Sequence, residues 1–135
     1  MDLNKALNIS AAGMDAQTMR LRVIAENLAN QDTTGSFPGA DAYRRKTITF
    51  ENHVDASTGS ATVQVKQIGQ DSTAQPLRYD PSNPAANADG YVKTPNVNSF
   101  IEVMDMREAE RSYSANLSVL QATRSMLDRT IAMLQ

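Results

Sequence analysis

The sequence of 135 residues contains no cysteine and no tryptophan, and it has a single histidine. Without cysteine the chain can form neither disulfides nor thiolate metal sites, and it has no thiol nucleophile. Aromatic residues make up only 5% of the chain. The hydrophobic core of an isolated copy is therefore expected to be thin. The lack of cysteine leaves the cellular compartment open, because such a chain suits any redox environment.

Long apolar runs and blocks of like charge are also missing. No uninterrupted apolar stretch is long enough to span a bilayer, and the N-terminus lacks the basic and apolar segments of a cleaved signal peptide. We therefore expect neither a direct membrane span nor a cleaved signal. Thirteen basic and fifteen acidic residues give a net charge of -2. Nucleic acid is not an expected partner of such a chain.

Catalytic and metal-binding patterns are absent as well. His53 lies in a polar segment near Glu51 and Asp55, but the sequence supplies no further ligand or base partner for it. The glycines match neither a phosphate loop nor a dinucleotide fingerprint, and no serine lies in a nucleophile-elbow context. We expect no enzyme activity, no catalytic residue, no metal and no cofactor.

The longest pattern that is present is the C-terminal segment 98–135, which contains no Pro or Gly. Its larger side chains recur at alternating steps of three and four residues, which predicts a helix of about 55 Å that packs along one face against another helix. Ser99 followed by Glu102 resembles a capping box at its start. The stripe includes Val103, Met106, the polar Glu110 and Arg124, and the residues expected at an interface: Tyr113, Leu117, Leu120, Leu127, Ile131 and Leu134.

Residues 2–30 predict the partner helix. Four apolar side chains recur there at every seventh position, namely Leu7, Met14, Leu21 and Leu28, and they complete the predicted interface. Val23 falls off this stripe and is expected to point away from it. Gly13 lies beside two alanines in this helix. Either another backbone approaches closely at this small-residue patch, or the helix merely tolerates the glycine.

The segment between the helices predicts a small β module. Turn-forming residues follow the first helix, and residues 43–51 and 62–68 read as the strands of an antiparallel hairpin. Residues 91–93 predict a third short strand. Leu77 and Tyr79 stand among prolines, which favours an extended, turned segment that is not a strand.

The predicted fold class is thus mainly α with a small antiparallel β insert, in which long N- and C-terminal helices pack as a coiled-coil-like pair. We expect residues 1–35 and 90–135 to form a helical core domain from both termini. Residues 36–89 would form the β-rich insert.

Two stretches resemble a known family. Residues 9–35 are similar to the N-terminal motif of the flagellar rod and hook axial proteins, in which a helix ends at Asn-Leu-Ala-Asn and a Thr-Gly turn follows. Residues 90–127 resemble the C-terminal motif of that family, and residues 79–98 resemble its proximal-rod members. The motif residues are Asn27, Leu28, Ala29, Asn30, Thr34, Gly35, Pro95, Asn96, Val97 and Asn98. Many relatives have Gly-Tyr after the Thr pair, whereas Ser36 follows Gly35 here, so the path after Gly35 stays open.

This resemblance implies a structural subunit of the proximal rod of the bacterial flagellar basal body, a hollow helical assembly that crosses the periplasm. The implied partners are other copies of the chain, other flagellar rod proteins and the flagellar type III export apparatus. A different class of function remains open, namely a soluble helical adaptor or export chaperone that binds one partner. A polymer subunit presents several distinct surfaces, whereas an adaptor saturates at a fixed small ratio.

Overall fold

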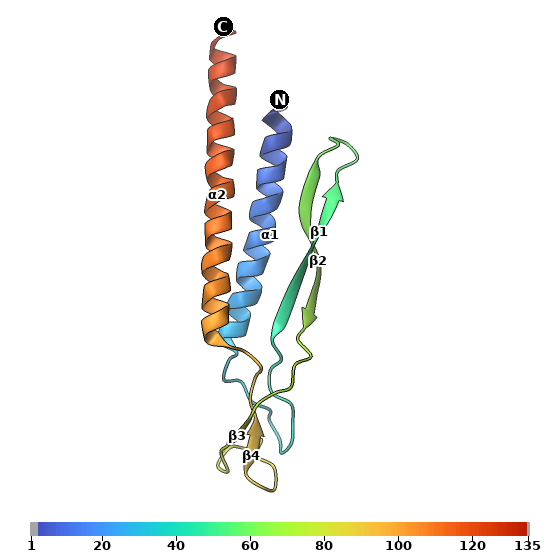
Figure 1. Cartoon of the computed structure of the whole chain (residues 1–135), viewed down its shortest axis with the longest axis vertical. Coiled ribbons are helices and arrows are strands. Elements are labelled where there is room, and N and C mark those ends of the chain that lie inside the picture. Colours follow the sequence, from blue (N-terminus) through green and yellow to red (C-terminus); the bar gives the residue numbers. More distant parts are fainter. Residues whose placement is uncertain (1–2, 135) are drawn as a thin grey trace. The chain divides into compact units, whose positions relative to one another are not determined.

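The computed structural model describes residues 3–134, which form two long helices and four strands (Figure 1). Helix α1 spans Leu3–Ala29 and helix α2 spans Ser99–Ala132. Between them in sequence lie β1 (Lys46–Val54), β2 (Ala61–Gln70), β3 (Leu77–Tyr79) and β4 (Tyr91–Lys93). The helices pack against each other, and the predicted fold class is confirmed. Neither helix has an apolar stretch that could cross a membrane within these residues.

The described chain divides into two compact units, each built from segments that are distant in sequence. The first unit contains residues 3–21, 48–67 and 106–134, and the second contains residues 22–47 and 68–105. Both helices and both strands of the β1–β2 hairpin continue from one unit into the other.

In the first unit, α1 and α2 approach closely where α1 has small residues. Gly13 is buried, and a Cβ atom on it would lie 2.8 Å from Nδ2 of Asn116. Ala16, one turn later, is buried too. Farther along the pair, Arg20 Nη2 lies 3.5 Å from Glu108 Oε2. Gly13 itself therefore has a packing role, because its nearest neighbours across the pair are the side-chain atoms of Asn116 on α2.

The predicted stripe of α2 consists of two series of residues, each recurring at every seventh position. The packed face of α2 agrees with one series and differs from the other. The series at every seventh residue that is half-buried comprises Met106, Tyr113, Leu120 and Leu127. The second series is displaced by one residue toward the N-terminus, to Glu102, Ala109, Asn116 and Thr123, of which all but Asn116 are buried. After Glu102 this line has the shorter side chains of Ala109, Asn116 and Thr123, and bulky apolar side chains there would hold the helix backbones apart. A pattern of large apolar residues cannot reveal such a line.

Val23 lies off the predicted stripe of α1, yet its side chain is only 4% exposed, so burial on α1 is not confined to that stripe. A single stripe describes a helix with one neighbour. In the first unit α1 has two neighbouring elements. Gly13 lies against α2, whereas Ala12 and Ala16 line a groove whose other side is formed by β2. More than one stripe of α1 is therefore covered.

The hairpin strands are placed a few residues from their predicted positions. Strand β1 begins at Lys46 and not at residue 43, because the preceding backbone bonds to side chains. The N–H of Ala42 donates to Gln75 Oε1 (3.2 Å), and the N–H of Arg45 donates to Asn96 Oδ1 (2.8 Å). Strand β2 extends one residue before and two residues after the predicted 62–68.

In the second unit, β3 pairs with β4 in an antiparallel two-stranded sheet, with Tyr79 opposite Tyr91. Residues 77–79 are thus a strand, contrary to the prediction. The flanking prolines do not interrupt its three residues, and both strands of such a sheet are edges, where proline is tolerated. The third strand, residues 91–93, is confirmed. The two tyrosine rings meet edge to face at 5.4 Å, and a Cβ on Gly90 would lie 2.8 Å from Tyr79, so glycine leaves room for this ring.

Helix α2 is capped one residue earlier than the capping box predicts. Asn98 Oδ1 accepts hydrogen bonds from the N–H groups of Phe100 (3.1 Å) and Ile101 (3.4 Å). The hydroxyl of Ser99 donates instead to Gln31. Asparagine is as effective a cap as serine, and the predicted cap is therefore corrected to Asn98.

Candidate functional site

The side chain of Asn27 joins three segments of the second unit. Its Oδ1 accepts hydrogen bonds from the Lys46 N–H (2.8 Å) and the Tyr43 hydroxyl (2.9 Å), and its Nδ2 donates to the Lys46 carbonyl (2.9 Å) and to Glu102 Oε2 (3.2 Å). The residue is 1% exposed. An amide is the side chain that offers both donors and acceptors in this geometry. Asn27 thereby ties the end of α1 to the start of β1 and to the first turns of α2.

Glu102 is fully buried, and Arg45 neutralises its charge. Arg45 Nε donates to Glu102 Oε1 at 2.5 Å. The guanidinium also lies 3.7 Å from Asp105 and 3.9 Å from Asp71. A buried carboxylate costs several kcal/mol unless it is paired and hydrogen-bonded. The burial of Glu102 therefore depends on Arg45.

Asn96 holds the segment that precedes α2. Its Oδ1 accepts from the Arg45 N–H, and its Nδ2 donates to the carbonyls of Asp71 (3.2 Å) and Thr73 (3.1 Å). This one side chain bridges three backbone positions from two segments. We use "motif cluster" for the residues joined in this way: Asn27, Tyr43, Arg45, Lys46, Asn96 and Glu102.

The path after Gly35 is a closed loop. The N–H of Tyr43 donates to the Thr33 carbonyl at 3.0 Å, which brings the two ends of the loop together. A Cβ atom on Gly35 would lie 2.5 Å from the Cβ of Ala40, so this close approach requires glycine.

Charge pairing supports the cluster at its edge. Lys46 Nζ lies 2.6 Å from Glu26 Oε2, and this hydrogen bond, together with the lysine charge, lowers the pKa of Glu26. The same contact raises the pKa of Lys46. Burial raises the pKa of Tyr43, which favours the neutral hydroxyl. This hydroxyl donates the hydrogen bond to Asn27 Oδ1.

The motif residues of both ends differ in exposure. Asn27 and Pro95 are buried; Leu28, Asn30, Thr34, Gly35, Asn96 and Val97 are half-buried; Ala29 and Asn98 are exposed. The structure brings the two motifs together, because Asn27 and Asn96 both bond to the short segment that contains Arg45 and Lys46.

The residues predicted at the interface lie at the margins of the packed faces. Leu7, Met14, Leu21, Leu28, Tyr113, Leu120 and Leu127 are half-buried, and Leu117, Ile131 and Leu134 are exposed. Which residues form an interface between copies stays a prediction. The half-buried ones are shared between the protomer core and its surface.

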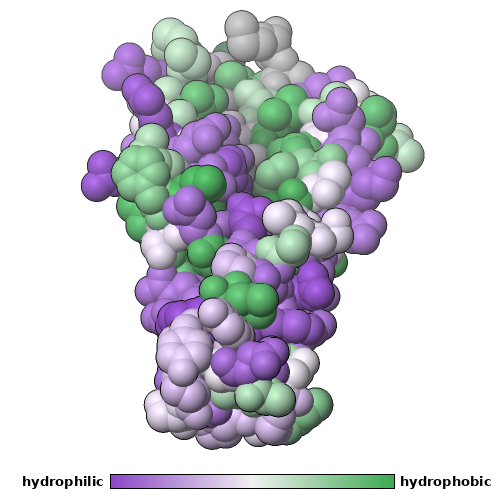
Figure 2. Space-filling view, turned by 60° about the horizontal axis from the view of Figure 1, so that its bottom comes forward, coloured by the Kyte–Doolittle hydropathy of each residue, from purple (hydrophilic) through white to green (hydrophobic). Residues whose placement is uncertain are grey.

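Helix α2 exposes many large apolar side chains. They are Phe100, Ile101, Val103, Met104, Leu117, Val119, Met126 and Ile131 within the helix, and Met133 and Leu134 directly after it. Figure 2 shows hydrophobic side chains lying among hydrophilic ones on the surface that it presents. Such exposure is typical of a surface that a protein partner covers.

The sequence did not predict the pairing of Arg45 with Glu102. In the sequence analysis Glu102 was interpreted as part of a helix cap. The two residues are 57 positions apart, and no spacing pattern connects them. Among residues 3–134 no group of three or more His, Cys, Asp or Glu side chains is placed to hold a metal ion. His53 is exposed on β1. The arrangement offers packing and hydrogen bonds.

Comparison with known proteins agrees with this picture. Residues 88–133 match the family model described as flagellar basal body rod FlgEFG protein, C-terminal. The chain is 49% identical over 133 residues to the flagellar basal-body rod protein FlgC of Agrobacterium fabrum, covering 98% of this chain and 96% of that protein. The FlgC of Salmonella typhimurium is 39% identical with 98% of both chains covered, and that of Bacillus subtilis is 36% identical with 93% and 94% covered. The chain therefore belongs to the FlgC family of flagellar basal-body rod proteins, and it is a structural subunit of the basal-body rod.

Proposed function

We propose that the chain assembles helically with copies of itself and with other rod proteins, and that its terminal helices form part of the proximal segment of a hollow rod that crosses the periplasm. In this proposal residues 1–35 and 90–135 form the helical part of each subunit, and residues 36–89 form the β-rich insert. The interface would include the predicted stripe residues of both helices.

The exposed apolar surface of α2 is the observation that supports this proposal most directly. Val119 and Met126 are both more than half exposed, and they lie seven residues apart on one side of the helix. Burying apolar area is worth about 25 cal/mol per Å², so covering such side chains would favour association. An isolated copy leaves them in water.

We further propose that the chain reaches the rod through the flagellar type III export apparatus, and that it acts without catalysis, cofactor or nucleic acid. Two features support passage through a narrow channel. The chain has no cysteine to cross-link it, and much of the apolar surface of its long C-terminal helix is uncovered. A structural role agrees with the relatives, which are named as rod proteins.

Val119→Asp tests the proposed surface, with Gln121→Asp as its matched control. Both positions are exposed in α2, and residue 121 lies about 200° around the helix from residue 119. We expect Val119→Asp to be excluded from basal bodies purified from a flagellated bacterium that lacks its own copy. Gln121→Asp should be incorporated, and far-UV circular dichroism should be the same for both variants. Equal incorporation of the two would contradict the proposal.

Stoichiometry separates the rod subunit from an adaptor. Light scattering during size-exclusion chromatography, with candidate rod proteins added, should show masses that grow with concentration. A complex that saturates at one small fixed ratio would instead support the adaptor or export chaperone.

A further inference from the structure

Methionine is the only sulfur-containing residue of this chain, which has seven methionines and no cysteine. Tryptophan, another side chain that oxidants attack, is also absent. The methionine thioethers are therefore the groups that a peroxide oxidises most readily here. Oxidation places one oxygen on the sulfur and converts a flexible apolar side chain into a polar one.

The methionines among residues 3–134 differ in exposure. The half-buried ones are Met14, Met19 and Met106. The exposed ones are Met104, Met126 and Met133, at 54%, 59% and 80%. A peroxide must reach the sulfur atom to react with it, so the exposed methionines are the ones expected to react first.

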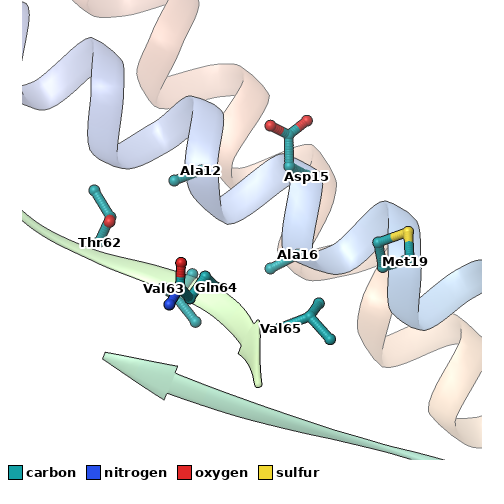
Figure 3. Close-up of a pocket in the computed structure, with 8 residues that line it drawn as sticks. All are labelled: Ala12, Asp15, Ala16, Met19, Thr62, Val63, Gln64 and Val65. Carbon is teal, nitrogen blue, oxygen red and sulfur yellow. The ribbon is translucent and has the colours of Figure 1, made fainter. Parts of the chain in front are cut away.

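Met19 illustrates the protected environment. It lines a groove of about 270 Å³ between α1 and β2 (Figure 3). Ala16 on the helix and Val65 on the strand line the same groove. Protein therefore lies on both sides of Met19, and only part of this side chain is open to solvent.

The two exposed methionines of the first unit lie on the surface to which the proposed function assigns assembly. Met126 follows Val119 by seven residues, and Met133 follows Met126 by seven. Residues at this spacing recur on one side of a helix. Met126 lies within α2, and Met133 directly follows its last residue, Ala132. The two thioethers are uncovered in the single copy and would be covered in the rod.

We propose that Met126 and Met133 are redox-sensitive sites, and that their oxidation by hydrogen peroxide keeps the chain out of the rod. This rests on the proposed function, since assembly is what covers the two side chains. The sulfur lone pair attacks one peroxide oxygen, a sulfur–oxygen bond forms, and the oxygen–oxygen bond breaks. The sulfur loses two electrons, and the second oxygen leaves as water.

The sulfoxide opposes assembly because its oxygen is a strong hydrogen-bond acceptor. In an apolar contact this oxygen would lose its water without gaining a donor, which is unfavourable. The same contact shields the unmodified sulfur in a subunit that has already assembled. Oxidation thus acts on the free chain and spares the finished rod.

Limited treatment with hydrogen peroxide followed by peptide mass spectrometry tests the accessibility. In the purified chain Met126 and Met133 should each gain one oxygen before Met14, Met19 and Met106 do. In purified basal bodies that contain the chain, both should be protected. Equal oxidation of exposed and half-buried methionines in the free chain, or unprotected Met126 in basal bodies, would overturn the inference.

Substitutions test the consequence for assembly. The variant with Met126→Gln and Met133→Gln places polar groups at both positions, and its matched control has Met126→Leu and Met133→Leu. In a flagellated bacterium that lacks its own copy, the glutamine variant should be incorporated into basal bodies roughly tenfold less than the control. Equal incorporation would overturn the inference and leave the rod function intact, whereas absence of the unsubstituted chain from basal bodies would refute the proposed function itself.

Direct oxidation supplies a second readout that does not depend on how the glutamine variant folds. The natural chain and the leucine variant are both treated with hydrogen peroxide, and light scattering is recorded with candidate rod proteins added. The growth of mass with concentration should be lost for the natural chain and kept for the leucine variant. Loss in both would assign the effect to other residues and overturn the role of Met126 and Met133.

Discussion

Arg45→Met removes the cation that neutralises the buried carboxylate of Glu102. Methionine replaces much of the arginine stem, but it leaves Glu102 Oε1 without the donor that lies 2.5 Å away. Breaking a buried pair by removing one partner costs about 3–5 kcal/mol. Arg45 is 23% exposed, so water reaches the site and the lower end, ~3 kcal/mol, is expected. A small domain has a free energy of unfolding of about 5–15 kcal/mol, so this loss is large.

The double variant Arg45→Met with Glu102→Leu should recover more than half of that loss. Replacing both partners of a buried pair by apolar side chains is often neutral or stabilising. Recovery will be incomplete, because Nδ2 of Asn27 loses one acceptor, at a cost of about 1 kcal/mol.

Urea unfolding followed by far-UV circular dichroism measures all four corners of the cycle, with Glu102→Leu as the last. A coupling energy of about 2 kcal/mol or more is expected between residues that act as one unit. Additive losses, with a coupling below about 0.5 kcal/mol, would refute the reasoning that the burial of Glu102 depends on Arg45.

Three further predictions follow from local contacts. Lys46→Met should raise the pKa of Glu26 in an NMR titration, and an unchanged pKa would contradict this. The contact between Lys46 and Glu26 stabilises the fold above about pH 4.5, and this stabilisation is lost as the pH falls through the lowered pKa of Glu26. Gly13→Ala should change the free energy of unfolding by less than about 1 kcal/mol, because the gain in helix propensity is offset by the cost of displacing Asn116. Gly13→Ala combined with Asn116→Ala should stabilise the chain in urea titrations. Amide hydrogen exchange on the dilute chain should find weak protection across residues 117–134, whose large side chains are mostly exposed, and strong protection there would be evidence against helix formation on assembly.

The two helices were predictable because their hydrogen bonds and stripes are local in sequence. The seven-residue recurrence from Leu7 to Leu28 and the Pro- and Gly-free segment 98–135 predict α1 and α2 to within a few residues. The hairpin followed from alternating residues and a polar loop. The Asn-Leu-Ala-Asn motif indicated the family, which the comparisons confirm.

The packed faces and the pairings across the chain were decided only by the tertiary structure. Val23 is buried because more than one stripe of α1 is covered, and Leu77–Tyr79 becomes a strand because β4 folds back beside it. Arg45 neutralises Glu102 only after the chain brings together residues 57 positions apart. Such contacts depend on how complete elements pack, and spacing along the sequence does not encode them. Helix periodicity predicts that a face is covered, whereas the shape and charge of the neighbour determine which side chains can lie there.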